Sequence, residues 1–435
     1  MKDTADAPGA TPVSTDSAVV RSARADSTLS SDSGAIAAPP ATTTADAAAV
    51  TPSAAAAAPT TGRIAPVAKP DAVRGLYLNA WAAGSTVKLQ KLIDIAKRTE
   101  INTFVIDVKE GGEISYRSRI KLANEIDAAQ PYIGNPRLLL QKLRDAGIYP
   151  IARIVAFKDK RLVAGRPGWS VKKADGSQWK DRDGNVWVDS FNRDVWNYNI
   201  EIAKEALDMG FAEVQWDYVR FPDVPASLMA TAVWPQRNGR TKADAIREFL
   251  LYSGAQLASY NVPITADVFG LTVSVKGDLG IGQQWEKMLD AADALLPMVY
   301  PSHFARGSYG IAAPNAAPYD IVKKAMDYAV KRSKGVPNAA EIRPWLQDFT
   351  LGPPKYTAAH VRAQIKATYD AGLNSWVLWN PGSNYTVAAL ASKDGVVPDL
   401  RIPAKTARKP TPKPAVKDTV VKMPPDTADN GNMSR

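Results

Sequence analysis

Three aspartates stand near the ends of short apolar segments, and their carboxyl groups are the side chains of this chain best suited to acid–base chemistry. They are Asp107, Asp217 and Asp267. Glycoside hydrolysis requires two carboxyl groups at one site. One is protonated and gives its proton to the leaving oxygen, and the other is ionised and either attacks the sugar or activates water. Repulsion between the two groups and unequal burial separate their pKa values for these two roles.

A structural alternative exists for the same carboxylates, because each has a basic residue with which it can form an ion pair. Asp217 can bind Arg153 or Arg220, and Asp107 can bind Lys109. Burying charged groups without a function is costly, however, so a group of such residues at several strand ends favours a shared site.

The amino-acid composition excludes several other kinds of catalytic group. The chain has no cysteine, which rules out a disulfide framework, a zinc ribbon, a thiol nucleophile and a cysteine-ligated iron–sulfur cluster. Its two histidines, His303 and His360, are too few for a histidine-rich metal site, and no HExxH pattern occurs. The aspartates within residues 173–189 do not follow the spacing of an EF-hand. We therefore expect no metal and no cofactor.

The elements that must position these carboxylates alternate between strand and helix from residue 73 onward. Strands are predicted at residues 73–81, 101–108, 149–157, 212–221, 262–269, 294–300, 342–349 and 375–379. Helices are predicted between them, the first capped by Ser85 and the others at residues 138–146, 195–209, 243–260, 285–292, 321–333 and 358–371. This α/β alternation predicts a parallel sheet with outer helices, and eight strands favour a closed (β/α)8 TIM barrel.

A doubly wound open sheet is the alternative architecture. It would need a glycine-rich phosphate-binding turn after its first strand, and residues 79–85 contain only Gly84. The sequence GDLGIG at residues 277–282 follows the fifth strand and leaves a phosphate-binding loop open. Phosphate sites of barrels usually lie after strands seven and eight, so we expect an ordinary connection there.

Alternation along the strands predicts which polar residues reach the mouth of the barrel, where the carboxyl ends of the strands carry catalytic groups. Asp107 and Lys109 share the inward face of the second strand. Asp217 occupies that face in the fourth strand, and Asp267 occupies it in the fifth. Arg153 is predicted to point inward beside them from the third strand.

Aromatic and hydrogen-bonding side chains near other strand ends complete the predicted site. All 11 tryptophans lie at or after Trp81, and the faces of tryptophan rings suit the apolar faces of sugars. Trp187 lies in the long segment after the third strand, Tyr300 and His303 follow the sixth, and Trp379 ends the eighth. The alternative is that several of these rings only pack loops or the barrel interior.

Six segments resemble a family of glycoside hydrolase domains found in uncharacterised bacterial proteins. They span residues 104–110, 151–159, 181–189, 213–222, 297–303 and 345–349. The most specific element is QxDYVRFP in the fourth of these segments, and the resemblance covers about residues 72–390. It implies a TIM barrel related to α-amylase-like and other retaining glycosidases, and it implies a class of reaction without a particular substrate.

The same resemblance implies roles for two of the aspartates. Asp217 matches the position of the nucleophile after the fourth strand. The acid–base residue is expected from a neighbouring strand end, where Asp267 matches in position, although the α-amylase type uses glutamate there.

The segments on either side of the predicted barrel differ from it in composition. Residues 1–70 are rich in alanine and contain no aromatic residue, so they cannot bury enough apolar area to offset the cost of ordering their backbone. Residues 401–435 alternate lysine and proline, which is typical of an extended, solvated segment. We expect two disordered tails and a barrel domain over residues 71–400.

Charge and hydropathy bear on partners and location. Residues 401–435 carry eight basic and three acidic residues, half of the chain's net charge of +10. The basic balance therefore predicts contact of this tail with an anionic cell wall or surface, and no specific nucleic-acid binding. No apolar run is long enough to span a membrane. No signal peptide is visible after Met1, yet linkers rich in alanine and proline are common after export signals, so we expect an exported protein.

Together these patterns predict a monomeric enzyme that hydrolyses a poly- or oligosaccharide, periplasmic or extracellular, with Asp217 and Asp267 as its catalytic pair. The residues expected to bind the substrate are Asp107, Lys109, Arg153, Trp187, Gln215, Arg220, Tyr300, His303, Gln347 and Trp379. The alternative is a non-catalytic protein of the cell envelope that binds polysaccharide or peptidoglycan with the same cleft.

Overall fold

The computed structural model describes residues 64, 66–400 and 402 of the chain. The disorder predicted for residues 1–70 and 401–435 therefore falls almost wholly outside the described residues. Within the described part of the first segment, Val67 packs against interior residues of the folded domain. Lys69 Nζ lies 2.8 Å from Glu341 Oε2, so this short stretch contacts the domain through both an apolar and a charged side chain.

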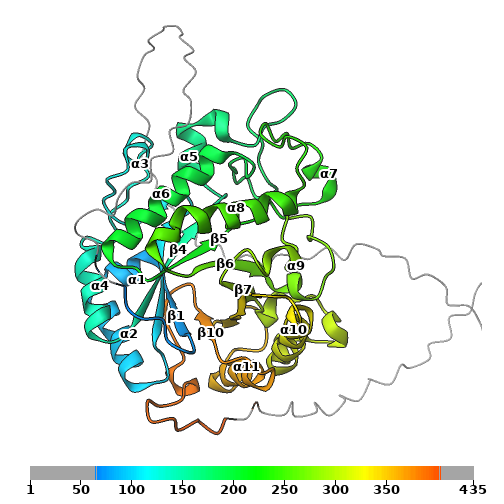
Figure 1. Ribbon diagram of the computed structural model, residues 1–435. Coiled ribbons are helices and arrows are strands. Elements are labelled where there is room, and N and C mark those ends of the chain that lie inside the picture. Colours follow the sequence, from blue (N-terminus) through cyan, green and yellow to red (C-terminus); the bar gives the residue numbers. More distant parts are fainter. Residues whose placement is uncertain (1–63, 65, 401, 403–435) are drawn as a thin grey trace, which may run out of the picture. The chain divides into compact units, whose positions relative to one another are not determined.

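Eight parallel strands close into a barrel at the centre of the domain (Figure 1). In order round the barrel they are β1 (Arg74–Leu78), β2 (Thr103–Glu110), β4 (Tyr149–Val155), β5 (Glu213–Asp217), β6 (Ile264–Phe269), β7 (Ala294–Met298), β9 (Trp345–Gln347) and β10 (Trp376–Trp379). β1 pairs with both β2 and β10, and this pairing closes the sheet. The predicted TIM barrel is confirmed, and the open-sheet alternative is wrong.

Two short strands modify the barrel without opening it. β8 (Glu341–Ile342) pairs with β7 before β9 does, so the predicted seventh strand is divided at Pro344, which has no N–H to donate to a neighbour. β3 (Glu113–Ile114) folds back antiparallel on β2. The turn between them contains two glycines of positive φ, which is the backbone conformation that tight turns of this kind require.

Helices surround the strands (Figure 1). In the described part of the chain they are α1 (Ala80–Gly84), α2 (Thr86–Arg98), α3 (Lys121–Glu125), α4 (Pro136–Asp145), α5 (Lys160–Gly165), α6 (Arg193–Met209), α7 (Ala226–Met229), α8 (Lys242–Leu257), α9 (Trp285–Met288), α10 (Pro318–Ser333) and α11 (Ala358–Asp370). The seven predicted helices correspond to α2, α4, α6, α8, α9, α10 and α11, although α9 ends at Met288 rather than at residue 292. The others are short and lie within connections.

Local signals explain where the long helices begin and end. Ser85 Oγ accepts a hydrogen bond from the backbone N–H of Lys88 at 3.3 Å and so caps α2, as predicted. α6 ends at Gly210, whose φ of 117° is in the left-handed region that favours glycine. Such ends are predictable because the interacting residues are close together in the sequence.

Two long connections on the carboxyl side of the strands pair with each other and build one wall over the barrel mouth. They follow β4 and β5. Lys172 bridges to Gln178 within the first connection and to Val233 in the second. Trp179 Nε1 donates to Thr231 Oγ1 at 3.0 Å across the same boundary. The wall is therefore held by contacts between segments more than 50 residues apart.

A buried ion pair occupies the opposite end of the barrel interior. Arg343 Nη1 lies 2.7 Å from Glu213 Oε1, and both side chains are fully buried. Tyr149 and Thr265 donate further hydrogen bonds to Glu213 at 3.2 and 3.1 Å. Buried charges of this kind are tolerated only when they are paired and hydrogen-bonded.

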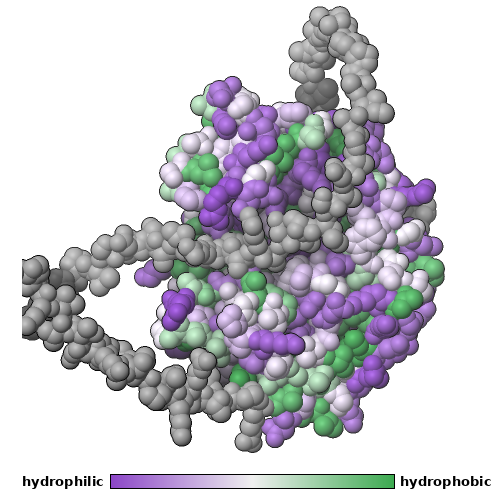
Figure 2. Space-filling model, turned by 180° about the vertical axis from the view of Figure 1, so that it is seen from behind, coloured by the Kyte–Doolittle hydropathy of each residue, from purple (hydrophilic) through white to green (hydrophobic). Residues whose placement is uncertain are grey.

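The surface of the domain is mixed in character. On the face shown in Figure 2, hydrophilic residues cover much of the surface and apolar residues lie between them. None of the helices in the described residues is long and apolar enough to cross a membrane.

Replacing Arg343 should show how strongly the fold depends on the buried pair. We expect Arg343→Met to lower the free energy of unfolding by about 3–5 kcal/mol, because Glu213 is left buried without its partner. Urea-induced unfolding measures this change. Arg247→Met is the matched control, because it breaks a part-exposed pair with Asp290 and should cost less than about 1 kcal/mol. Equal losses in the two variants would contradict the prediction.

Candidate active site

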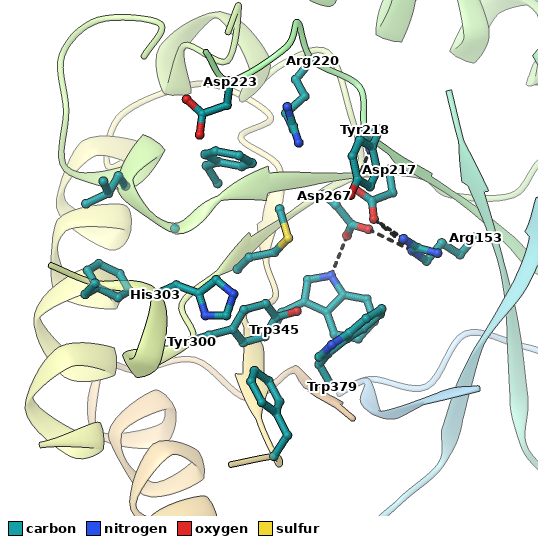
Figure 3. Close-up of a pocket in the computed structure, with 16 residues that line it drawn as sticks. Arg153, Asp217, Tyr218, Arg220, Asp223, Asp267, Tyr300, His303, Trp345 and Trp379 are labelled. Atoms are coloured by element: carbon teal, nitrogen blue, oxygen red, sulfur yellow. Dashed lines mark hydrogen bonds and ion pairs between the residues drawn. The ribbon is translucent and has the colours of Figure 1, made fainter. Parts of the chain in front are cut away.

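A pocket of about 250 Å³ opens at the mouth of the barrel, on the carboxyl side of the strands (Figure 3). Its charged lining residues are Arg153, Asp217, Arg220, Asp223 and Asp267. Its aromatic lining residues are Tyr218, Phe269, Tyr300, His303, Phe304, Trp345, Phe349 and Trp379. The pocket thus combines carboxyl groups with rings, as the sequence predicted for this end of the barrel.

Arg153, on β4, is a cation shared by four carboxylates. Its Nη1 lies 2.5 Å from Asp107 Oδ1 and 2.6 Å from Glu110 Oε2. Its Nη2 and Nε lie 2.5 and 3.0 Å from Asp217 Oδ2. Its Nε lies 3.9 Å from Asp267 Oδ2. One buried positive charge therefore faces up to four negative ones, so the carboxylates cannot all be ionised at equal cost.

The structure brings Asp217 and Asp267 together in one site. Each carboxylate has an oxygen within 4 Å of the same atom, Arg153 Nε. The distance between those two oxygens cannot exceed the sum of 3.0 and 3.9 Å. In Figure 3 both side chains point into the pocket next to the Arg153 guanidinium.

Asp217 is held in the way expected of an ionised carboxylate. Besides the two contacts from Arg153 to Oδ2, the backbone N–H of Tyr218 donates to Oδ1 at 2.5 Å. Tyr218 has a φ of 49°, a left-handed conformation that a tyrosine adopts at a cost of roughly 1–3 kcal/mol and that often occurs at functional sites. These donors stabilise the negative charge and fix the direction of the carboxylate.

Asp267 lies in surroundings that favour its protonated form. Burial raises the pKa of its carboxyl well above the usual value, the negative charge of Asp217 raises it further, and Arg153 opposes both effects. Trp345 Nε1 donates to Oδ1 at 2.6 Å, and Gln215 Nε2 donates to both oxygens at 2.9 and 3.1 Å. The two carboxyl groups of the site therefore lie in different surroundings, because Arg153 pairs with Asp217 while burial raises the pKa of Asp267.

Asp107 lies behind this pair, 2% exposed. Burial raises the pKa of Asp107 to about 6, an effect that the Arg153 charge opposes and the Glu110 charge increases. Tyr77 donates its hydroxyl to Asp107 Oδ2 at 2.5 Å. Asp107 therefore acts on the pocket through Arg153 and Tyr77 and does not line it.

Aromatic rings form one side of the pocket. Trp379 stacks on Tyr77 with ring centroids 3.9 Å apart, and Trp345 meets Trp379 edge-on at 5.6 Å. Tyr300 and His303 line the neighbouring stretch. Burial lowers the pKa of His303 to about 4, so this ring is neutral at pH 7 and offers a hydrogen bond rather than a charge.

The prediction that Lys109 lies at the barrel mouth is wrong. The pairing of β2 with β4 shifts register between Asp107 and Lys109, and this bulge turns Lys109 out of the barrel. Its Nζ lies 2.6 Å from Asp159 Oδ2 and 2.9 Å from Asn199 Oδ1 on α6, and the side chain is fully buried. Lys109 therefore joins the strand to helix α6 and cannot reach a ligand in the pocket.

Three other predicted binding residues are buried and do not line the pocket. Trp187 is 2% exposed, and its Nε1 donates to Asp181 Oδ2 at 3.0 Å, so it packs the loop wall. Gln215 holds Asp267, as described above. Gln347 accepts a hydrogen bond from the backbone N–H of Ser302 at 3.1 Å and so orients the segment that carries His303. None of these three side chains lines the pocket, so the structure does not place them where they would contact a bound sugar.

The structure also places at the site residues that the sequence did not single out as binding residues. Glu110 bonds Arg153 although its own side chain is 50% exposed. Asp223 and Trp345 line the pocket, and Tyr77 carries the Asp107 contact. The predicted strands end at residue 108 and at residue 221, before Glu110 and Asp223, so alternation within those strands gave no direction for either side chain.

The glycine-rich stretch 277–282 serves the same wall. The carbonyl of Ile281 accepts from the backbone N–H of Phe221 at 2.8 Å, and the carbonyl of Gly280 accepts from Lys242 Nζ at 2.6 Å. These contacts hold the segment that follows Asp217. Among the described residues, no group of three or more histidine, aspartate or glutamate side chains is arranged to hold a metal ion.

Comparison with known proteins places this site in context. Residues 75–385 match the family described as "Putative glycosyl hydrolase domain". No curated protein sequence matches the chain. The structure is similar to the PgaB (BpsB) glycoside hydrolase domain from Bordetella bronchiseptica, with a TM-score of 0.53 and 13% identity over 74% of this chain and 99% of that one. At this identity the likeness shows the fold.

Two further solved structures are similar over part of the chain. A hypothetical protein from Ruminiclostridium thermocellum is 39% identical over 44% of this chain and 97% of its own, with a TM-score of 0.41. The glycoside hydrolase domain of PelA from Pseudomonas aeruginosa is 14% identical over 73% of this chain and 97% of its own, with a TM-score of 0.42.

The raised pKa of Asp107 should appear as a pH dependence of stability. The folded state keeps this proton up to about pH 6, whereas an unfolded carboxyl loses it near 3.8, so the unfolded state binds fewer protons between these values. The Asp107 contribution to stability therefore falls as the pH rises through that window. We expect the unfolding free energy of the wild type minus that of Asp107→Asn to fall by about 2–3 kcal/mol between about pH 4 and about pH 6.5. A difference that stays constant over this range would contradict the assignment.

Proposed function

The chain belongs to the family of glycosyl hydrolase domains that its residues 75–385 match, and from that premise we propose that it hydrolyses glycosidic bonds in a poly- or oligosaccharide with Asp217 and Asp267 as the catalytic pair. The observation that carries the proposal is the pairing itself. Two carboxyl groups share one guanidinium nitrogen, Arg153 pairs closely with one of them, and burial raises the pKa of the other. This is the requirement of glycoside hydrolysis.

In the proposed mechanism Asp267 is the general acid. Its protonated carboxyl gives a proton to the oxygen of the leaving group as the glycosidic bond breaks. The Trp345 and Gln215 N–H groups and the nearby Arg153 charge then stabilise the carboxylate that remains. Because these donors are in place before the proton leaves, little reorganisation accompanies the step.

Asp217 is the nucleophile in this proposal. Its ionised carboxylate attacks the anomeric carbon, and the Arg153 contacts direct it into the pocket. Asp217 and Asp267 both approach Arg153 Nε, so the two carboxyl groups lie close enough together to act on one glycosidic bond. Water would then release the sugar, with Asp267 taking a proton from that water and returning to its starting state.

The aromatic side of the pocket supports sugar binding. Trp379 and Trp345 present rings beside the carboxyl pair, and Tyr300 and neutral His303 can exchange hydrogen bonds with hydroxyl groups. Export of the protein, a monomeric state, a barrel domain over residues 71–400 and contact of residues 401–435 with an anionic surface remain part of the proposal, on the composition of the sequence alone.

Removing either carboxyl group should abolish hydrolysis. We expect Asp217→Asn and Asp267→Asn each to lower kcat by about 10³-fold or more, measured as reducing-sugar release on a panel of poly- and oligosaccharides. Asp183→Asn, in an exposed loop, is the control and should leave kcat unchanged. Hydrolysis that survives Asp217→Asn contradicts the mechanism. Binding without turnover by the wild type on the whole panel would favour a non-catalytic glycan-binding protein.

The pH profile should reveal the acid. The Trp345 indole N–H lowers the pKa of Asp267 by donating to its carboxylate, so Trp345→Phe should raise that pKa. Because the general acid must be protonated, the alkaline limb of the kcat/KM profile should move to higher pH in this variant. An unchanged alkaline limb, in a variant whose thermal unfolding shows it to be folded, would exclude Asp267 as the group that this limb reports.

A further inference from the structure

The pocket contains two arginines in opposite electrostatic situations. Arg153 lies close to four carboxylates, and its charge is fully used within the protein. Arg220, on the loop just after β5, lines the same pocket, and no carboxylate of the described residues forms an ion pair with it. Its guanidinium donates to the backbone carbonyl of Phe221 at 3.0 Å. Arg220 is therefore a cation in the pocket whose counter-ion the described protein does not supply.

Aromatic rings hold the Arg220 guanidinium in place. Its central carbon lies 4.7 Å from the ring centroids of Tyr218 and Phe269 and 5.2 Å from that of Trp187. Trp187 is itself fixed by its hydrogen bond to Asp181. Ring faces attract a guanidinium and restrict its rotation, so less conformational entropy is lost when it binds a ligand. The group is thus positioned and charged, but not neutralised.

Neighbouring acids do not take over this charge. The Asp217 carboxylate is engaged by Arg153 and by the backbone of Tyr218. Asp223 lines the pocket too (Figure 3), but its side chain is exposed to solvent, and it forms no ion pair with Arg220. An exposed carboxylate is screened by water and salt and repels a bound anion only weakly.

We infer that the sugar bound beside the catalytic pair carries an acidic substituent, and that Arg220 binds this substituent. The inference rests on the proposed function and specifies its substrate class. A planar guanidinium fork matches the oxygens of a carboxylate, as in a uronic acid, and equally those of a sulfate ester. A purely structural role for Arg220 would make binding indifferent to the charge of the sugar.

Matched pairs of oligosaccharides that differ only in charge test this inference. The probes are oligogalacturonate with its methyl ester, hyaluronan oligosaccharides with their carboxyl-reduced form, and sulfated carrageenan oligosaccharides with their desulfated form. Titration calorimetry on full-length Asp217→Asn measures binding without turnover. For at least one pair we expect the acidic member to bind about 10- to 100-fold more tightly, as one charge-assisted contact allows. The pair concerned tells a carboxylate substrate from a sulfated one.

Substitutions of Arg220 in the same background assign the preference to this residue. Arg220→Gln should bring the acidic and neutral members to equal affinity, and Arg220→Lys, which keeps the charge without the fork, should retain part of the difference. Arg182→Gln, on the exposed loop, is the matched control and should retain all of it. Thermal unfolding checks that the variants are folded.

The outcomes separate this inference from the proposed function. Equal or weaker binding of the acidic member in all three pairs overturns the inference, as does a preference that survives Arg220→Gln. Hydrolysis of neutral glycans without a charge preference would also overturn the inference, but it would support the proposed glycosidase activity. An Arg220-dependent preference in a wild type that hydrolyses no probe would support the inference and count against the catalytic roles.

Discussion

The contact between the Arg153 guanidinium and the carboxylates around it is the interaction on which the barrel mouth depends. Four carboxylates lie within ion-pair distance of one buried cation. Leaving a buried charge without its partner costs about 3–5 kcal/mol. Asp217 accepts two hydrogen bonds from Arg153, more than any of the other three carboxylates. Asp267 is farther from the guanidinium and more completely buried, and burial raises the pKa of its carboxyl. In the proposed mechanism, this unequal sharing of one cation separates the nucleophile from the general acid.

The barrel makes this sharing possible by fixing the register of three neighbouring strands. Asp107 on β2 is the pairing partner of Arg153 on β4, and Arg153 is in turn the partner of Gln215 on β5. Asp217 lies two residues beyond Gln215 on the same face, so it reaches the guanidinium from the far side. Closure of the sheet then brings β9 across the interior, where Trp345 donates to Asp267. The geometry of the candidate site therefore depends on the closed ring and not on any single strand.

The two arginines of the pocket differ in function because their surroundings differ. Arg153 is compensated by protein carboxylates and tunes them, and its charge is not available to a ligand. Arg220 is surrounded by aromatic rings, which orient it without neutralising it. Two arginine side chains at one site thus serve different purposes, because carboxylates pack against Arg153 and aromatic rings pack against Arg220.

The sequence by itself determined the order of the eight strands and the main helices, the closed barrel, and the meeting of Asp217 with Asp267. These depend on hydrophobic periodicity, on helix caps and on the alternation of side chains, all of which act over a few residues. Only the tertiary structure decided that Lys109 leaves the mouth, because a bulge reverses the alternation at that point. It also decided that Trp187 supports Arg220 instead of facing a ligand, because loops far apart in the sequence pack there. The raised pKa of Asp267 also depends on the tertiary structure, because burial and the charges of residues from other strands cause it, and neither is a local property of the chain.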